Sequence, residues 1–248
     1  MLRSTFACKL AILDKLVDAP LRIVNTNPIV YLDVTIDKDN VGRIAVELFA
    51  DSVPKTAENF RSLCTGERGT FRHTWRPGSN PCPLHYKGIP FHRIIRNFIV
   101  QGGDILCRDG RGNNSVFGYT FFDESFEGKA GNHVAGTLAM AHDGPNRNGS
   151  QFFFNLKDNF YLNKRYVVFG QVLEGIEVLK KLNSIGTNCG VPLKKSWITE
   201  CGQAGVNKLP MKDFDQADWY LHPPQHALAN VSPSTGSEIF SDKETRQM

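Results

Sequence analysis

The chain has 248 residues, of which 41% are hydrophobic and 22% are charged, and its formal net charge is +4. This length accommodates one large domain or two small ones, and so modest a charge argues against the strongly basic face of a nucleic-acid-binding protein. No apolar run approaches the roughly 18 residues of a membrane-spanning helix, so the sequence predicts no membrane partner.

The first 26 residues form an N-terminal extension in this interpretation. A short apolar patch at 10–13 is followed by Asp14, Lys15 and Asp18. The patch is too short and too charged for a secretory signal, and the two acids argue against a mitochondrial presequence. Six cysteines without a CxxC pair fit reduced thiols. We therefore expect a cytoplasmic protein, with the nucleus as the alternative compartment.

The first elements expected along the chain are a β-hairpin and a helix. Residues 29–37 and 43–49 are β-prone, and a polar turn at 39–42 joins them. Asp51 to Pro54 open a helix, because a polar residue precedes it and proline suits its first turn. The apolar residues of that helix, at helical spacing before residue 66, are Ala57, Phe60, Leu63 and Cys64.

The rest of the chain predicts more short strands and a second helix. The strand candidates lie at 91–100, 136–141, 151–156, 166–173 and 195–199, and the helix candidate lies at 174–183. Many short strands with two isolated helices favour a β-barrel capped by helices over a parallel α/β sheet. From residue 204 onward Pro, Ser, His, Asn and Gln are common, which predicts a partly disordered C-terminal tail over 204–248.

Generic motifs identify no cofactor or metal site. Gly110-Arg111-Gly112 opens a short polar segment that lacks the third glycine of a dinucleotide-binding fingerprint. The sequence contains no P-loop, HExxH or GxSxG motif. We therefore expect neither a cofactor nor a metal.

Three sequence blocks carry a more specific signal. They read VPKTAENFR at 53–61 with CTGE at 64–67, then FHRII at 91–95 with FIVQGGD at 98–104, and last GPN at 144–146 with NGSQFF at 148–153 and VVFG at 167–170. In this order they closely resemble the cyclophilin family of peptidyl-prolyl cis-trans isomerases, which catalyse rotation about X-Pro peptide bonds. The resemblance covers residues 27–203.

The resemblance implies a mainly β domain, a closed eight-stranded antiparallel β-barrel capped by two helices. That domain spans 27–203 and contains an insertion at about 68–90. Side chains fill a barrel of eight strands, so substrate binds on its outer surface. The implied partners are proline-containing peptides and proteins, and we expect a monomer.

The resemblance also assigns roles to residues. Arg93 matches the catalytic arginine, which points a guanidinium donor at the twisting peptide bond, and Gln101 orients it while Phe98 lies against the proline. The residues that match substrate-binding positions are Ile99, Ala141, His142, Gln151, Phe153, Tyr161, Leu162 and Tyr166.

Several of these residues depart from the family pattern. His142 stands where Asn is usual, Tyr161 replaces a Trp of the cyclosporin-binding rim, and Tyr166 replaces a His on the pocket floor. We expect altered specificity, reduced turnover and weak cyclosporin binding. Two functions stay open: an active isomerase that assists protein folding, and a proline-peptide-binding scaffold with vestigial catalysis.

The insertion resembles that of a divergent-loop subgroup, with LHYKG at 84–88. Its prolines predict a stiff loop without regular structure. No Asp or Glu occurs from 68 to 103, so the loop is either a solvated segment or a basic collar that favours acidic clients. In the same subgroup, Cys64 and Cys201 match a proposed redox-sensitive pair, the alternative being two buried thiols.

Overall fold

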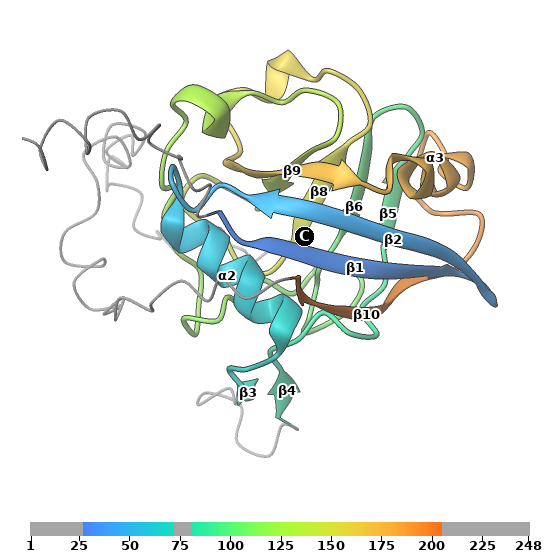
Figure 1. The fold of residues 1–248 in the computed structure, drawn as a ribbon, viewed down its shortest axis with the longest axis horizontal. Coiled ribbons are helices and arrows are strands. Elements are labelled where there is room, and N and C mark those ends of the chain that lie inside the picture. Colours follow the sequence, from blue (N-terminus) through green and yellow to red (C-terminus); the bar gives the residue numbers. More distant parts are fainter. Residues whose placement is uncertain (1–26, 72–80, 205–248) are drawn as a thin grey trace, which may run out of the picture.

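The computed structural model describes residues 27–71 and 81–204, which form a mainly β domain (Figure 1). Eight strands make one antiparallel sheet in the order β10-β1-β2-β9-β7-β8-β6-β5. Their bounds are β1 Ile29–Ile36, β2 Asp39–Leu48, β5 Arg93–Ile95, β6 Ile99–Gly102, β7 Thr137–Met140, β8 Phe152–Asn155, β9 Val168–Glu174 and β10 Ser196–Ala204.

The edge strand β10 meets the segment that precedes the other edge strand, β5, without forming a ladder. A single bridge joins Pro90 to Trp197, flanked by bonds from the Phe91 N–H to the Ser196 carbonyl and from the Ile198 N–H to the Ile89 carbonyl. Pro90 sits at the position of the bridge whose amides do not bond across, where its missing N–H costs nothing. The prediction of a mainly β domain with an eight-stranded sheet is confirmed. The prediction of a closed barrel is slightly overstated, because only this narrow seam joins the two edges of the sheet.

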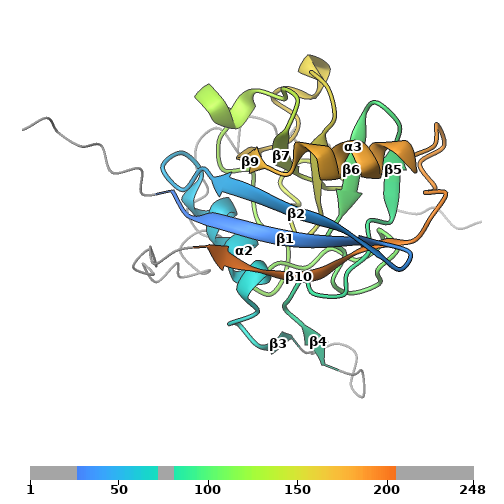
Figure 2. The same ribbon diagram turned by 45° about the vertical axis from the view of Figure 1, so that its right-hand side comes forward.

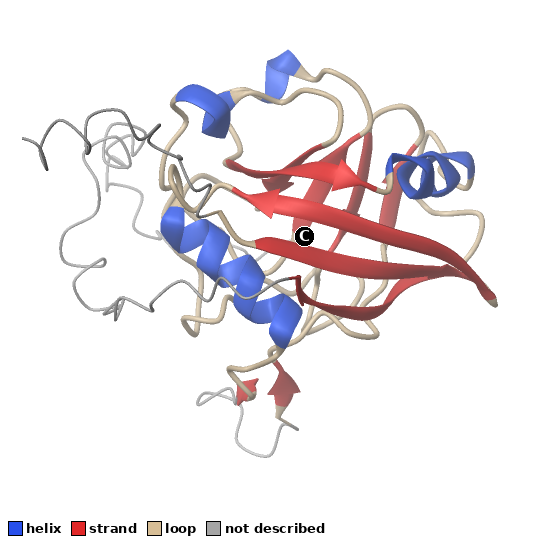
Figure 3. Ribbon diagram, viewed as in Figure 1, coloured by secondary structure: helices blue, strands red, loops and turns tan. Residues whose placement is uncertain are grey.

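Two helices flank the barrel, as predicted. The helix α2 (Pro54–Thr65) lies at the left of Figure 1 and contacts β1, β9 and β10, whereas α3 (Ile176–Ser184) lies at the right and contacts β2, β5 and β6. Figure 3 shows the strands curving around one interior, with both helices outside it. Two 3-10 turns, η1 (Gly128–Gly131) and η2 (Phe160–Leu162), lie in the loops.

Aromatic side chains fill the interior, so ligands must bind outside it. Phe60 of α2 is fully buried, and its ring centroid lies 5.1 Å from those of Tyr86, Phe152 and Phe169. The other apolar residues predicted on this helix, Ala57, Leu63 and Cys64, are also fully buried.

Two predicted element boundaries were wrong. The hairpin turn lies at 37–38, where Asp37 has φ +53°, and β2 already begins at Asp39. A register shift leaves Val41 without a partner, so a bulge takes up the residues assigned to the turn. The run at 91–100 is split into β5 and β6 by a turn in which Asn97 has φ +56°, a conformation that Asn tolerates.

The insertion also differs from prediction, because its base has regular structure. The short strands β3 (Thr70–Phe71) and β4 (Cys82–Pro83) pair and project below the barrel (Figures 1 and 2). Residues 72–80, the N-terminal extension and the tail from 205 onward lie outside the described residues. Among the helices of the described part, none has the length and apolarity to cross a bilayer.

Candidate active site

The pairing of four strands places the central predicted site residues in one row. Arg93 of β5 is opposite Gln101 of β6, which is opposite Phe153 of β8, which in turn is opposite Ala139 of β7. Directly opposed residues of antiparallel strands share a face of the sheet. Arg93 is exposed, so this row marks the outer wall of the barrel.

A directed chain of hydrogen bonds runs along this wall. Arg93 donates from Nη1 to Gln101 Oε1 at 3.3 Å, and Gln101 donates from Nε2 to Gln151 Oε1 at 3.0 Å. Gln151 then donates from Nε2 to the carbonyl oxygens of Gly110 at 2.8 Å and Gly112 at 2.7 Å. The chain holds one edge of the Arg93 guanidinium and leaves the exposed group able to donate to a ligand.

The apolar residues predicted around the proline lie beside this chain. Ile99, Phe153 and Leu162 are each less than one-tenth exposed. Phe98 stacks on Tyr161, whose ring centroid is 5.8 Å away and which is 59% exposed. The structure thus combines buried apolar side chains with an exposed aromatic ring, which suits the compact, apolar ring of proline.

Tyr166, which the sequence predicts on the pocket floor, packs against two other predicted site residues. Its ring meets that of Phe153 edge to face with centroids 5.5 Å apart, and it packs against the His142 ring at 4.6 Å. The structure therefore brings Tyr166 together with His142 and Phe153.

The imidazole of His142 contacts other parts of the domain and is nearly inaccessible to solvent. Its side chain is only 6% exposed, and its Nε2 lies 2.9 Å from the backbone carbonyl oxygen of Arg165. The neighbouring residue Ala141 is buried, and its backbone N–H donates to the Gln151 carbonyl. Any contact of His142 with a peptide would therefore come from its backbone, since the imidazole faces the protein.

A cavity of about 400 Å³ adjoins the Arg93 chain and adds residues that the sequence analysis missed. Of its lining residues, Gln101, Ala141, His142 and Gln151 were predicted, whereas Gly110, Arg111, Asn113 and Asp143 were not. The signal available for the first three was the glycine-containing segment that fails as a dinucleotide fingerprint. Its glycines pack closely against other side chains, Gly110 against His92 and Gly112 against Asp104, and their carbonyl oxygens accept from Gln151.

The thiols predicted as a redox pair lie in an environment that disfavours their reaction. His85 Nε2 lies 3.1 Å from the Cys64 carbonyl oxygen and 3.4 Å from the Cys201 sulfur. Burial raises the pKa of Cys64 well above its ordinary value and that of Cys201 to about 12. The thiolate is the reactive form of cysteine, so the buried-thiol alternative fits the structure better.

Three cations of the proposed basic collar form ion pairs or hydrogen bonds with other parts of the domain. Arg68 pairs with Glu58, Lys87 pairs with Glu200, and Arg96 donates to the Gly186 carbonyl. Arg72 and Arg76 lie outside the described residues. Of the collar cations in the described part, Arg93 alone is bonded to Gln101, and the basic collar stays a prediction.

A filled antiparallel barrel with an exposed arginine beside apolar side chains on its outer wall agrees with the class that the sequence blocks indicated, the cyclophilin-type prolyl isomerases. The family described as "Cyclophilin type peptidyl-prolyl cis-trans isomerase/CLD" matches residues 31–203, well over half of the chain. The chain belongs to this family, and its activity is peptidyl-prolyl cis-trans isomerisation. Membership implies binding of proline-containing peptides.

Proposed function

We propose that this isomerase acts on X-Pro bonds of protein clients and so assists their folding, with Arg93 as the catalytic donor. The observation that carries the proposal is the exposed Arg93 guanidinium, held by Gln101 beside the apolar wall of Phe98 and Phe153. In this assignment the proline ring lies against Ile99, Phe153 and Leu162, and Tyr161 forms the rim.

The energetics suit such a site. Rotation about a peptide bond has a barrier of about 18–20 kcal/mol because it destroys amide resonance. An acceleration of about 10⁵ requires roughly 7 kcal/mol of preferential binding to the twisted state. A charged donor that is already oriented can supply about 3–4 kcal/mol of this. The rest must come from contacts that become stronger when the peptide bond is twisted, since contacts that hold the proline ring equally in both states lower no barrier.

Replacement of Arg93 tests the assignment. We expect Arg93→Ala to lower kcat/KM for a model X-Pro peptide by roughly 10²–10³. Arg93→Lys should recover only part of the loss, because the ammonium lacks the planar fork of donors. Rates equal to wild type in both variants would remove Arg93 from the mechanism.

The alternative function, a proline-binding scaffold with vestigial catalysis, draws on the packed floor. Tyr166 contacts both His142 and Phe153, which leaves less room for a ring to turn. Under this alternative, wild type and Arg93→Ala would show equal isomerisation rates while a proline peptide still bound both. NMR exchange spectroscopy on one peptide measures rate and binding together.

We further propose that cyclosporin binds weakly, because Tyr161 replaces the larger indole at the rim. Tyr161→Trp enlarges the ring that stacks on Phe98 and adds an N–H donor. We expect this variant to bind cyclosporin at least tenfold more tightly by calorimetry, with Phe160→Trp, a neighbouring exposed ring, as the matched control. Equal affinities of Tyr161→Trp and wild type would contradict the proposal.

The assembly state and the compartment belong to the same proposal. We propose a monomer in the cytoplasm, with the nucleus as the alternative. Light scattering of the purified full chain tests the first statement, and imaging of the full chain carrying a fluorescent tag tests the second. A dimer, or a signal in any other compartment, would contradict them.

A further inference from the structure

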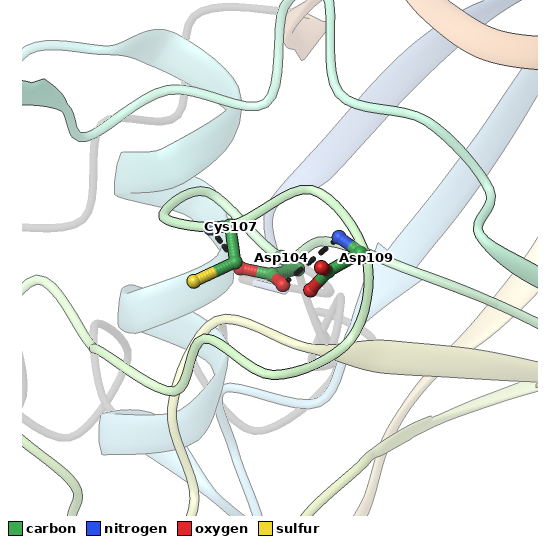
Figure 4. A group of neighbouring side chains, drawn as sticks. All are labelled: Asp104, Cys107 and Asp109. Carbon is green, nitrogen blue, oxygen red and sulfur yellow. Dashed lines mark hydrogen bonds between the residues drawn. The ribbon is translucent and has the colours of Figure 1, made fainter.

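The loop that follows β6 wraps around the carboxylate of Asp104, which is fully buried (Figure 4). The two carboxylate oxygens accept five backbone N–H bonds with lengths between 2.8 and 3.2 Å. The donors are the N–H groups of Leu106, Cys107, Asp109, Gly110 and Gly112. One side chain therefore sets the path of the whole loop.

This cluster is not built as a cation site, although Asp104, Cys107 and Asp109 bring ligand atoms within 4.8 Å of one another (Figure 4). A carboxylate offers about four lone-pair positions, and the five N–H groups occupy those of Asp104. Asp109 is paired with Arg111, whose Nε lies 2.8 Å from its carboxylate. The oxygens that a metal would need are already in use.

The fit of the loop around Asp104 is tight. A Cβ atom on Gly112 would lie 2.2 Å from Asp104 Oδ1, so only glycine allows this approach. Gly110 has φ +97°, and a Cβ there would lie 2.9 Å from the His92 ring. Both glycines are held in place, and both present their carbonyl oxygens to Gln151.

The hydrogen-bond chemistry makes the chain from this loop to Arg93 directional. The loop offers Gln151 two carbonyl oxygens, so the amide nitrogen of Gln151 must face the loop and its oxygen must face Gln101. The amide nitrogen of Gln101 then faces Gln151, and its oxygen is left to accept from Arg93. Displacement of the two loop carbonyls would remove the contacts that fix the orientation of the Gln151 amide and, through it, that of the Gln101 amide.

We propose that Asp104 is a positioning residue for the isomerase reaction, which fixes the Gly110 and Gly112 carbonyls and, through Gln151 and Gln101, the orientation of Arg93. The inference rests on the proposed role of Arg93 as donor. Asp104 itself touches no substrate.

Asp104→Asn tests the proposal with almost no change in shape. The amide nitrogen of the new residue would face backbone N–H donors and repel them, so the loop must shift. We expect kcat to fall roughly 10- to 100-fold with little change in KM, the penalty of a misplaced catalytic group. Glu124→Gln is the matched control. It also replaces a buried acid that accepts backbone N–H bonds, but Glu124 is not part of the hydrogen-bond chain that leads to Arg93. Its kcat per folded molecule should equal that of wild type.

Two further measurements separate positioning from a general loss of structure. In an Arg93→Ala background, Asp104→Asn should cause no additional loss of kcat, and in the otherwise wild-type chain it should shift the NMR resonance of the Arg93 Nε–H. Gly112→Ala, which pushes the loop off the carboxylate, should reproduce both results. An equal loss with and without Arg93, an unmoved Arg93 resonance, or failure of both variants to fold would overturn the proposal. If Arg93→Ala alone is as active as wild type, the proposed catalytic role of Arg93 is wrong. The shift of the Arg93 resonance in Asp104→Asn still reports whether Asp104 influences the orientation of Arg93.

Discussion

Tyr166 illustrates how one side chain can tune this site without touching its donor. The ring lies between His142 and Phe153, with centroid distances of 4.6 and 5.5 Å. Under the proposed assignment, the Tyr166 ring would limit the room in which the substrate's peptide bond turns beside Phe153. We therefore expect slow turnover even though Arg93 is retained.

Tyr166→His should therefore accelerate catalysis. The smaller imidazole leaves more room above Phe153, and we expect kcat/KM for a short X-Pro peptide to rise up to about tenfold, equivalent to about 1.4 kcal/mol. Tyr166→Phe, which keeps the ring and removes only the hydroxyl, is the control and should stay close to wild type. A histidine variant no faster than the phenylalanine variant would show that the floor does not limit turnover.

At the scale of elements, α2 shows that the N-terminus of a helix can be capped by a residue that is distant in the sequence. Its N-cap residue Val53 has no capping side chain, and Glu124 takes that role. The Glu124 carboxylate accepts from the Lys55 and Thr56 N–H groups and from the Thr56 hydroxyl, at 2.8–2.9 Å. Burial raises the pKa of Glu124, against the effect of these donors.

We expect Glu124→Gln to destabilise the domain by about 1–2 kcal/mol, because an amide cannot accept at both positions. Guanidinium denaturation should show a lower midpoint with an unchanged slope. The control is Asp51→Asn at the same helix end, where the acid is half-exposed in an ion pair with Lys129 and is worth at most about 1 kcal/mol. Equal midpoints for Glu124→Gln and Asp51→Asn would contradict a capping role.

The same helix shows what the sequence could and could not predict. Proline after a polar residue located its start, and apolar spacing located its buried face, because both signals are local. The cap could not be found, since Glu124 lies 69 residues from Lys55 along the chain. The orienting role of Gln101 was predicted from the family resemblance, but the hydrogen bonds that join Asp104 to Gln151 through the loop were missed for the same reason. They depend on which backbone and amide atoms meet in space, and residue types alone do not record that. The misplaced hairpin turn reflects a bulge at Val41, and the missed turn between β5 and β6 reflects the left-handed backbone of Asn97; at both places the local backbone geometry departs from the sequence pattern.

For the whole molecule, the seam between β10 and the segment before β5 is the weak side of the barrel. On the other edge of β10 a ladder runs the full length of β1, from Ile29 to Ile36, interrupted by one register shift. The seam has one bridge, at Pro90, and three backbone bonds that involve Gly88, Phe91 and Ile198. Arg93 begins β5 just beyond this seam, so opening of the seam would loosen the strand that carries the proposed donor.

Native-state hydrogen exchange should therefore divide the barrel into two parts. The seam amides of Gly88, Phe91 and Ile198 should exchange by a local opening, with a lower free energy and a smaller denaturant dependence than the amides of β1, which need global unfolding. Saturation with a proline peptide that contacts Arg93 should raise the protection of the Phe91 amide more than that of β1, because the ligand holds β5 in place. Exchange of seam and β1 amides with one common free energy would show instead that the barrel closes as firmly at its single bridge as along its ladders.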